Sequence, residues 1–171
     1  MDKQSQLQWN MRGILIDWLI QVHSLFHLLP ETLFLCVNII DRFLSARRVT
    51  PDKLQLVGIA SMVIAAKMEE ILSPSFNNLL QCVGWTYATA ELLVAEKRIL
   101  ETIDWNLNYP NPIHFLRRIS KADDYHLKTR TVAKYLMEIQ YFEWRLLSTT
   151  PSTLAAAALW LPGSSRERTI G

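Results

Sequence analysis

Glycine is scarce in this sequence, at five of 171 residues. None of the five falls in a GxGxxG or Walker loop that would hold a nucleotide phosphate, or in a GxSxG nucleophile turn. An HExxH zinc motif is absent too, and the adjacent Glu69 and Glu70 suit a solvated helix end better than an acid–base pair. We therefore expect a protein that is not an enzyme and that needs no cofactor.

Cysteine is rarer still, because only Cys36 and Cys82 occur and they form no CxxC pair. Both lie in apolar helical context, which predicts buried, reduced thiols and a reducing, intracellular compartment. His23 and His27 are four residues apart, a spacing that can chelate a metal ion on a helix. No third ligand is near them in the sequence, so we expect no metal site.

Neither sign of charge dominates: 18 lysines and arginines against 16 acids leave a net charge of +2. This excess is too small to predict a nucleic-acid partner, and the pairs Arg47-Arg48 and Arg117-Arg118 suit solvated faces. The sequence also lacks an uninterrupted apolar run of membrane-spanning length and a signal peptide. We expect neither nucleic acid nor a membrane among its partners.

What the sequence does contain is helical periodicity. Three of its seven prolines follow a hydroxyl residue, at Thr50-Pro51, Ser73-Pro74 and Thr150-Pro151, as at helix starts. No segment keeps the period-two alternation of a strand, so the predicted fold class is all-α. The expected helices lie near residues 10–28, 31–45, 51–71, 75–83, 88–104, 113–122, 125–147 and 151–161.

The third of these helices is the most informative. Its sequence LQLVGIASMVIAA is apolar on nearly every side, which predicts a helix surrounded by protein. Small residues such as Gly58, Ala60 and Ala65 would let neighbouring helices approach closely. We expect this helix to be central, with four others around it.

The start of this helix, TPDKL (50–54), has a similar sequence one hundred residues later, TPSTL (150–154). This internal repeat predicts two similar helical domains. Residues 1–108 would form the first, 109–112 a proline-containing linker, and 113–171 the second. The second repeat is expected to break at Pro162 and to be incomplete, with 162–171 as an atypical tail and with apolar faces on 113–161 left uncovered.

Several motifs resemble the cyclin box: MRGILIDWL (11–19), PETLFLCVNIIDRFL (30–44) and KLQLVGIASMVIAAKMEE (53–70). The segment 111–139 is similar to mitotic B-type cyclins, particularly fungal ones. The resemblance implies a cyclin fold with one complete five-helix cyclin-box repeat and an incomplete second repeat. It also implies a regulatory subunit, found in the nucleus and cytoplasm, that binds and activates a cyclin-dependent kinase during mitosis. A cyclin-fold scaffold that binds transcription machinery or another protein remains the alternative.

The resemblance assigns kinase binding to Lys67 and Glu96, which would hydrogen-bond the kinase backbone around its C-helix. Apolar contacts would come from Ile64, Leu100 and Trp105, while Met68 replaces a usual aromatic residue. From the residues alone, a lysine extending to solvent and a solvated glutamate remain open.

The first expected helix, near residues 10–28, carries a second expected surface. Met11, Ile14 and Leu15 share one arc of the helical wheel with Trp18, while Ile16 and Ile20 lie on roughly the opposite side. The resemblance implies a docking patch for substrates or inhibitors that contain Arg-x-Leu, formed by Met11, Ile14, Leu15, Trp18, Gln21, Leu54 and Gln55. Gln21 stands where the family usually has an acid, which predicts weaker or altered docking selectivity. From the residues alone, a purely structural core remains open.

Arg12 and Asp41 resemble the family's buried ion pair between two helices; two exposed charges are the alternative. Arg12 also begins an RxxL sequence, but a helix buried in a domain cannot be read as an extended degradation motif.

Overall fold

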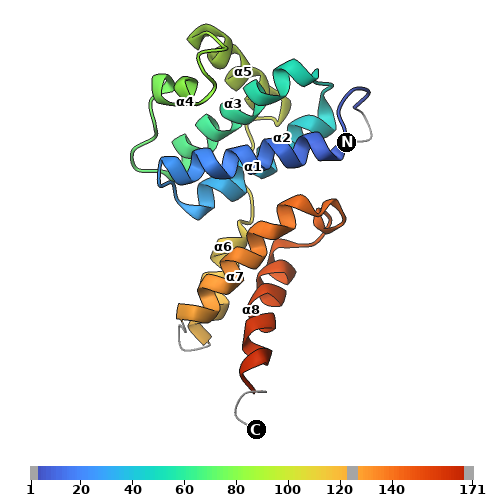
Figure 1. Ribbon diagram of the computed structural model, residues 1–171, viewed down its shortest axis with the longest axis vertical. Coiled ribbons are helices and arrows are strands. Elements are labelled where there is room, and N and C mark those ends of the chain that lie inside the picture. The colour runs from blue at the N-terminus through green and yellow to red at the C-terminus, as the bar shows by residue number, and fades with distance from the viewer. Residues whose placement is uncertain (1–3, 123–126, 168–171) are drawn as a thin grey trace. The chain divides into compact units, whose positions relative to one another are not determined.

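The computed structural model describes residues 4–122 and 127–167, and all regular elements in these ranges are helical (Figure 1). The all-α prediction is therefore confirmed. The chain divides into two units, Met1–Tyr109 and Pro110–Gly171. In the described ranges, no helix combines the length and the apolar character needed to span a membrane.

Unit 1 is built around one central helix. Its helices are α1 (Trp9–Leu25), α2 (Pro30–Ala46), α3 (Pro51–Glu69), α4 (Phe76–Cys82) and α5 (Thr89–Thr102). Every residue of α3 from Leu56 to Ala66 is buried, and α3 contacts the other four helices. The expected central position of this helix is confirmed, since its small residues leave room for neighbours on all sides.

Gly58 lies at a close approach of α1 to α3. A Cβ atom at this position would lie 2.8 Å from the Leu15 Cδ1 atom of α1. This distance is shorter than carbon atoms tolerate, so glycine is required for the side chain of Leu15 to keep its place.

The N-terminus of α2 is capped by a residue far along the chain. The Leu29 backbone N–H donates a hydrogen bond of 2.7 Å to Glu70 Oε1, and the Thr32 hydroxyl donates to the same oxygen. Leu29 has no capping side chain of its own. The residue that follows α3 therefore supplies the acceptor, and its negative charge also suits the positive end of the helix dipole.

Unit 2 contains α6 (Pro112–Ala122), α7 (Leu127–Ile139), two short 3₁₀ segments (Gln140–Phe142 and Trp144–Leu146) and α8 (Pro151–Glu167). Asn111 starts α6, because its Oδ1 accepts the Ile113 N–H at 3.1 Å. The prediction of one helix over 125–147 is wrong beyond Ile139, and its residues 125–126 lie outside the described ranges. Glu143 adopts an extended backbone and accepts hydrogen bonds from Arg145, two residues ahead, which competes with helical pairing.

The prediction that the last helix breaks at Pro162 is also wrong. α8 continues through this proline to Glu167. The fixed φ of proline is close to the helical value, but the residue lacks the N–H that would bond to the carbonyl four residues earlier, and its ring crowds that carbonyl.

The two cysteines are free, but only Cys36 is buried. Burial, followed by the nearby Asp41 charge, raises the pKa of the Cys36 thiol far above its usual value. Cys82 is half-buried and its thiol lies 3.5 Å from the Asn78 carbonyl oxygen, so the expectation of two buried thiols is wrong for Cys82.

Candidate protein-binding surfaces

An ion pair joins the end of α3 to the middle of α5. Lys67 Nζ donates a hydrogen bond of 2.6 Å to Glu96 Oε1. The lysine side chain is 48% exposed and the glutamate side chain 11%, so the pair has one solvated partner and one nearly buried partner. Lys67 Nζ also lies 5.0 Å from the centre of the Phe76 ring on α4, a cation–π distance. The lysine is thus positioned from two sides, and no sequence pattern indicated the part played by Phe76.

The three apolar residues expected beside this pair differ in their access to a partner. Ile64 is buried one turn before Lys67, and Leu100 is half-buried one turn after Glu96. Trp105 follows α5 and is 64% exposed. Of the three, Trp105 is the side chain most open to contact.

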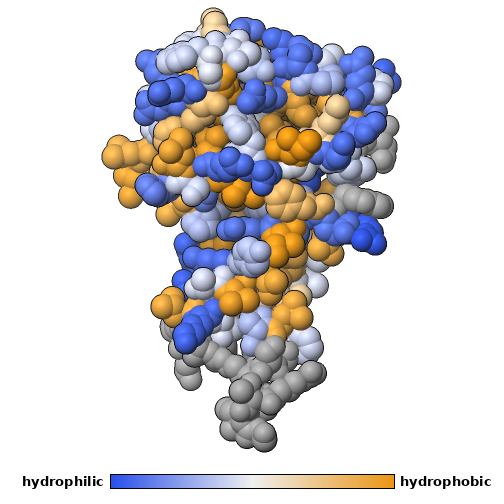
Figure 2. All heavy atoms as spheres, viewed as in Figure 1, coloured by the Kyte–Doolittle hydropathy of each residue, from blue (hydrophilic) through white to orange (hydrophobic). Residues whose placement is uncertain are grey.

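Four further apolar residues near this pair in the chain are exposed: Met68, Ile71, Leu72 and Leu93, of which Ile71 is 99% exposed. The resemblance had named Met68, whereas the other three were not predicted. We call the Lys67–Glu96 pair together with Leu100, Trp105 and these four residues the ion-pair face. Figure 2 shows apolar residues interspersed with polar ones over the visible surface. The sequence pattern alone cannot find such residues, because exposure depends on how α3 and α5 pack.

A groove of about 410 Å³ lies between α1 and the start of α3. The residues that line this docking groove are Met11, Ile14, Leu15, Trp18, Pro51, Leu54 and Gln55. Six of the seven residues expected in the docking patch are therefore brought together. Leu15 and Leu54 are buried, whereas Ile14 is 69% exposed. Pro51 was not predicted; its place in the first turn of α3, three residues before Leu54, was the available signal.

Gln21 does not line the docking groove. Its amide nitrogen donates to Asp17 Oδ2 at 3.1 Å, one turn earlier on α1. Gln21 and Asp17 are both exposed. A carboxylate therefore remains on this helix beside position 21, although position 21 itself is neutral.

Arg12 and Asp41 meet between α1 and α2. Arg12 Nε donates to Asp41 Oδ1 at 2.6 Å and its Nη2 donates to Oδ2 at 2.8 Å. The Arg12 side chain is 2% exposed and the Asp41 side chain 27%. This two-point geometry fixes the register of the two helices more firmly than one contact could.

The two histidines of α1 are not arranged as a chelating pair. His23 Nε2 lies 2.9 Å from the Leu29 carbonyl oxygen, and His27 lies beyond the end of α1 with a positive φ of 50°. Among the described residues, no group of three or more His, Cys, Asp or Glu side chains could hold a metal ion.

A five-helix unit built around a buried helix, followed by a second helical unit, defines a class of all-α folds, and the sequence matches identify the family. The model of the cyclin N-terminal domain matches residues 1–108, and that of the cyclin C-terminal domain matches residues 110–163. The chain belongs to the cyclin family, which confirms the resemblance found in its motifs.

Fungal mitotic cyclins are among the relatives. The chain is 57% identical over 160 residues to the G2/mitotic-specific cyclin-B of Emericella nidulans, and 52% identical over 161 residues to the G2/mitotic-specific cyclin-3 of Saccharomyces cerevisiae. Each match covers 94% of this chain but only 34% and 38% of the respective relative. The chain thus spans about a third of the length of the curated relatives it matches.

A solved structure supports the fold independently. The X-ray structure of a viral cyclin from herpesvirus saimiri matches with a TM-score of 0.84 at 23% sequence identity. The match covers 92% of this chain and 71% of the viral chain. The cyclin fold is therefore retained at low sequence identity.

Proposed function

We propose that this chain is the kinase-binding part of a mitotic cyclin, which binds a cyclin-dependent protein kinase and activates it. The observation that carries this proposal is the Lys67–Glu96 pair, which has exposed apolar side chains close to it in the chain. An apolar face with polar groups at its edge is typical of a protein interface. The fungal relatives, whose names are those of G2/mitotic cyclins, support the same function.

The chemistry of the pair suits the capture of a helix. Lysine has three N–H donors, and Glu96 takes only one of them. The remaining donors can bind kinase backbone carbonyls, and the second oxygen of Glu96 can accept a backbone N–H. These directional bonds would set the orientation of a kinase helix that apolar contact alone would leave free to slide.

Activation would follow from that orientation. A correctly placed C-helix completes the kinase Lys–Glu pair that holds the ATP phosphates. The cyclin chain itself would contribute no catalytic group. We therefore expect histone phosphorylation only when the chain and a cyclin-dependent kinase are both present.

The variant Lys67→Ala with Glu96→Ala tests the proposal. We expect kinase affinity to fall at least roughly tenfold, as losing polar groups at an interface does, while the free energy of unfolding changes little. The matched control is Glu143→Ala with Arg145→Ala, which removes an exposed ion pair of unit 2 and should leave kinase binding unchanged. Equal kinase affinity for the test variant and wild type would refute the assignment.

The alternative, a scaffold without kinase activation, is distinguished by the same assay. A chain that binds the kinase but leaves its phosphorylation rate unchanged would support the scaffold. The proposed location, the nucleus and cytoplasm, can be tested by imaging a fluorescently tagged chain.

We further propose that the docking groove binds Arg-x-Leu segments of substrates or inhibitors. Its buried Leu15 and Leu54 can receive the leucine, and Asp17 lies on the same helix one turn from Gln21 for the arginine. Because Gln21 is neutral, the variant Gln21→Glu should bind an Arg-x-Leu peptide several-fold more tightly at low salt. Calorimetry measures this, and equal affinities would refute the prediction that the neutral Gln21 weakens docking.

A further inference from the structure

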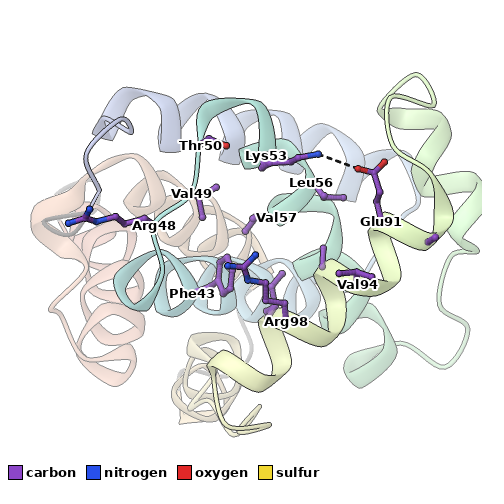
Figure 3. Close-up of a pocket in the computed structure, with 13 residues that line it drawn as sticks. Phe43, Arg48, Val49, Thr50, Lys53, Leu56, Val57, Glu91, Val94 and Arg98 are labelled. Carbon is purple, nitrogen blue, oxygen red and sulfur yellow. Dashed lines mark hydrogen bonds and ion pairs between the residues drawn. The ribbon is translucent and has the colours of Figure 1, made fainter.

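A hollow in unit 1 shares no lining residue with the docking groove (Figure 3). It lies between the end of α2, the start of α3 and α5, and has a volume of about 490 Å³. Its floor is apolar and buried, formed largely by Phe43, Leu56, Val57 and Ile99. This volume is in the range of sites that take up small ligands or the side chains of a partner.

The edge of this hollow is predominantly cationic, so we call it the basic pocket. Arg48, Lys53 and Arg98 line it, and Glu91 is its only acidic lining residue. Lys53 and Glu91 form an ion pair of 3.2 Å that spans from α3 to α5, as Figure 3 shows. Both side chains of this pair are about half exposed, at 47% and 46%. Arg48 and Arg98 are exposed and form no ion pair with any described residue, so a positive charge surplus remains.

Two residues at the edge of the basic pocket lie on a different side of α5 from Glu96. Val94 and Arg98 each lie two positions from Glu96 on α5, which places them about 200° around the helix axis from it. An occupant of the basic pocket would therefore leave Lys67 and Glu96 accessible.

The walls of the pocket are already fixed. The side-chain nitrogen of Gln4 donates to the carbonyls of Leu44 and Arg47, both at 2.6 Å, and its oxygen accepts the Val49 N–H at 3.0 Å. These three bonds hold the loop that carries Arg48. On the other side, the Tyr87 hydroxyl donates to the Asp52 carbonyl at 2.7 Å and so holds the start of α3. A preformed site loses less entropy on binding than a flexible one.

We propose that the basic pocket docks an extended peptide segment of a partner protein, in which large apolar side chains are flanked by aspartate or glutamate. The apolar floor would take the apolar side chains, and Arg48 and Arg98 would pair with the flanking carboxylates. The exposure of Val94, at 67%, leaves the pocket open on one side, as a chain passing across it requires. The docking groove differs in charge, since no cationic residue lines it.

Fluorescence anisotropy with three labelled peptides tests this proposal on the chain alone, without kinase. The probes are GEDLDFDEG, its neutral counterpart GQNLNFNQG and its basic counterpart GKRLKFKRG. We expect the acidic peptide to bind at least roughly tenfold more tightly than the other two at the basic pocket, with an affinity that falls as salt rises. Since kinase is absent from this assay, a failure here would not bear on kinase activation.

Variants of the pocket residues show whether the acidic peptide binds in the basic pocket. Arg48→Glu with Arg98→Glu should reduce acidic-peptide affinity at least roughly tenfold, and Val94→Asn should reduce it several-fold. The matched control, Lys121→Glu with Lys128→Glu, changes the net charge equally in unit 2 and should bind like wild type. Circular dichroism and urea unfolding verify that all variants fold.

Three results would overturn the proposal. Equal binding of the acidic and neutral peptides would show that charge does not select the occupant. Equal losses in the pocket variant and the unit 2 control would show non-specific attraction. A self-associated chain that the pocket variant converts to a monomer in sedimentation would identify a second copy as the occupant instead.

Discussion

Arg12 is a charged side chain at 2% exposure, which a folded chain tolerates because Asp41 binds it at two points. Asp41→Ala would remove that carboxylate and leave the guanidinium buried. Because Asp41 is itself 27% exposed, we expect a loss of about 3 kcal/mol, the lower end for a broken buried pair. Urea unfolding followed by circular dichroism measures the change.

The exposed pair Lys97 and Glu101 on α5 is the control for this experiment. Their atoms are 3.8 Å apart and both side chains are more than half exposed. Glu101→Ala should change the free energy of unfolding by less than about 0.5 kcal/mol. If Asp41→Ala were equally mild, the Arg12–Asp41 contact would not hold α1 against α2.

Tyr109 gives a pH dependence that can be assigned to one side chain. Its burial, followed by the Asp41 charge, raises the pKa of the hydroxyl from 10.0 to about 12. Below about pH 10 the hydroxyl is protonated in both folded and unfolded chains. Between about pH 10 and pH 12 only the unfolded chain releases this proton, so stability falls as pH rises through that window.

Tyr109→Phe removes this ionisation. We therefore expect the variant to lose less unfolding free energy than wild type between about pH 9 and pH 12. Chemical denaturation at a series of pH values measures the difference. Parallel pH curves for the two proteins would assign the alkaline loss to other groups.

At the scale of elements, Glu70 links the end of α3 to the start of α2. It follows α3 and accepts the hydrogen bonds that cap α2 from Leu29 and Thr32. Glu70→Ala would leave the Thr32 hydroxyl, which is fully buried, without this acceptor. We expect a loss of about 1–2 kcal/mol, the usual cost of a lost cap, and a smaller loss for Glu70→Gln, which keeps an acceptor oxygen. Thermal unfolding of both variants tests this, and equal losses would contradict it.

Most elements could be predicted because local signals and packing agree. Pro51 marks the start of α3, and the apolar, small-residue sequence that follows it predicts the central helix. The errors lie where tertiary or short-range contacts override periodicity. The backbone at Glu143 turns out of the helical conformation, and α8 continues through Pro162. Neither outcome is encoded in apolar spacing.

The binding surfaces were predictable only in part. Lys67 and Glu96 are distant in sequence, and the roles proposed for them came from resemblance to a family rather than from spacing. The docking groove shows the same limit, since six expected residues line it while Gln21 lies outside and Pro51 was missed. The basic pocket was not predicted, because its cations come from a loop and two helices that meet only in the fold.

At the scale of the whole molecule, the two units differ in how much apolar surface they leave exposed for their size. Unit 2 spans Pro110–Gly171 and exposes many large apolar side chains: Leu127, Val132, Tyr135, Ile139, Phe142, Leu146, Leu147, Trp160 and Leu161. A unit of this size has little apolar burial to stabilise it.

We therefore expect amides of α6, α7 and α8 to exchange hydrogen faster than those of α3. Hydrogen exchange followed by mass spectrometry compares the two units within one sample, so α3 serves as the internal control. Equal protection in both units would show that unit 2 is stabilised as well as unit 1.

The missing Cβ of Gly58 has a consequence for how the docking groove could diversify. Leu15 forms part of that groove, and a methyl group at position 58 would displace it from behind. Gly58→Ala would thus make the groove shallower without altering any atom that a docked peptide touches. Substitutions at position 58 could therefore change which peptides the groove accepts, although this residue contacts none of them. An alignment restricted to contact residues would overlook this position.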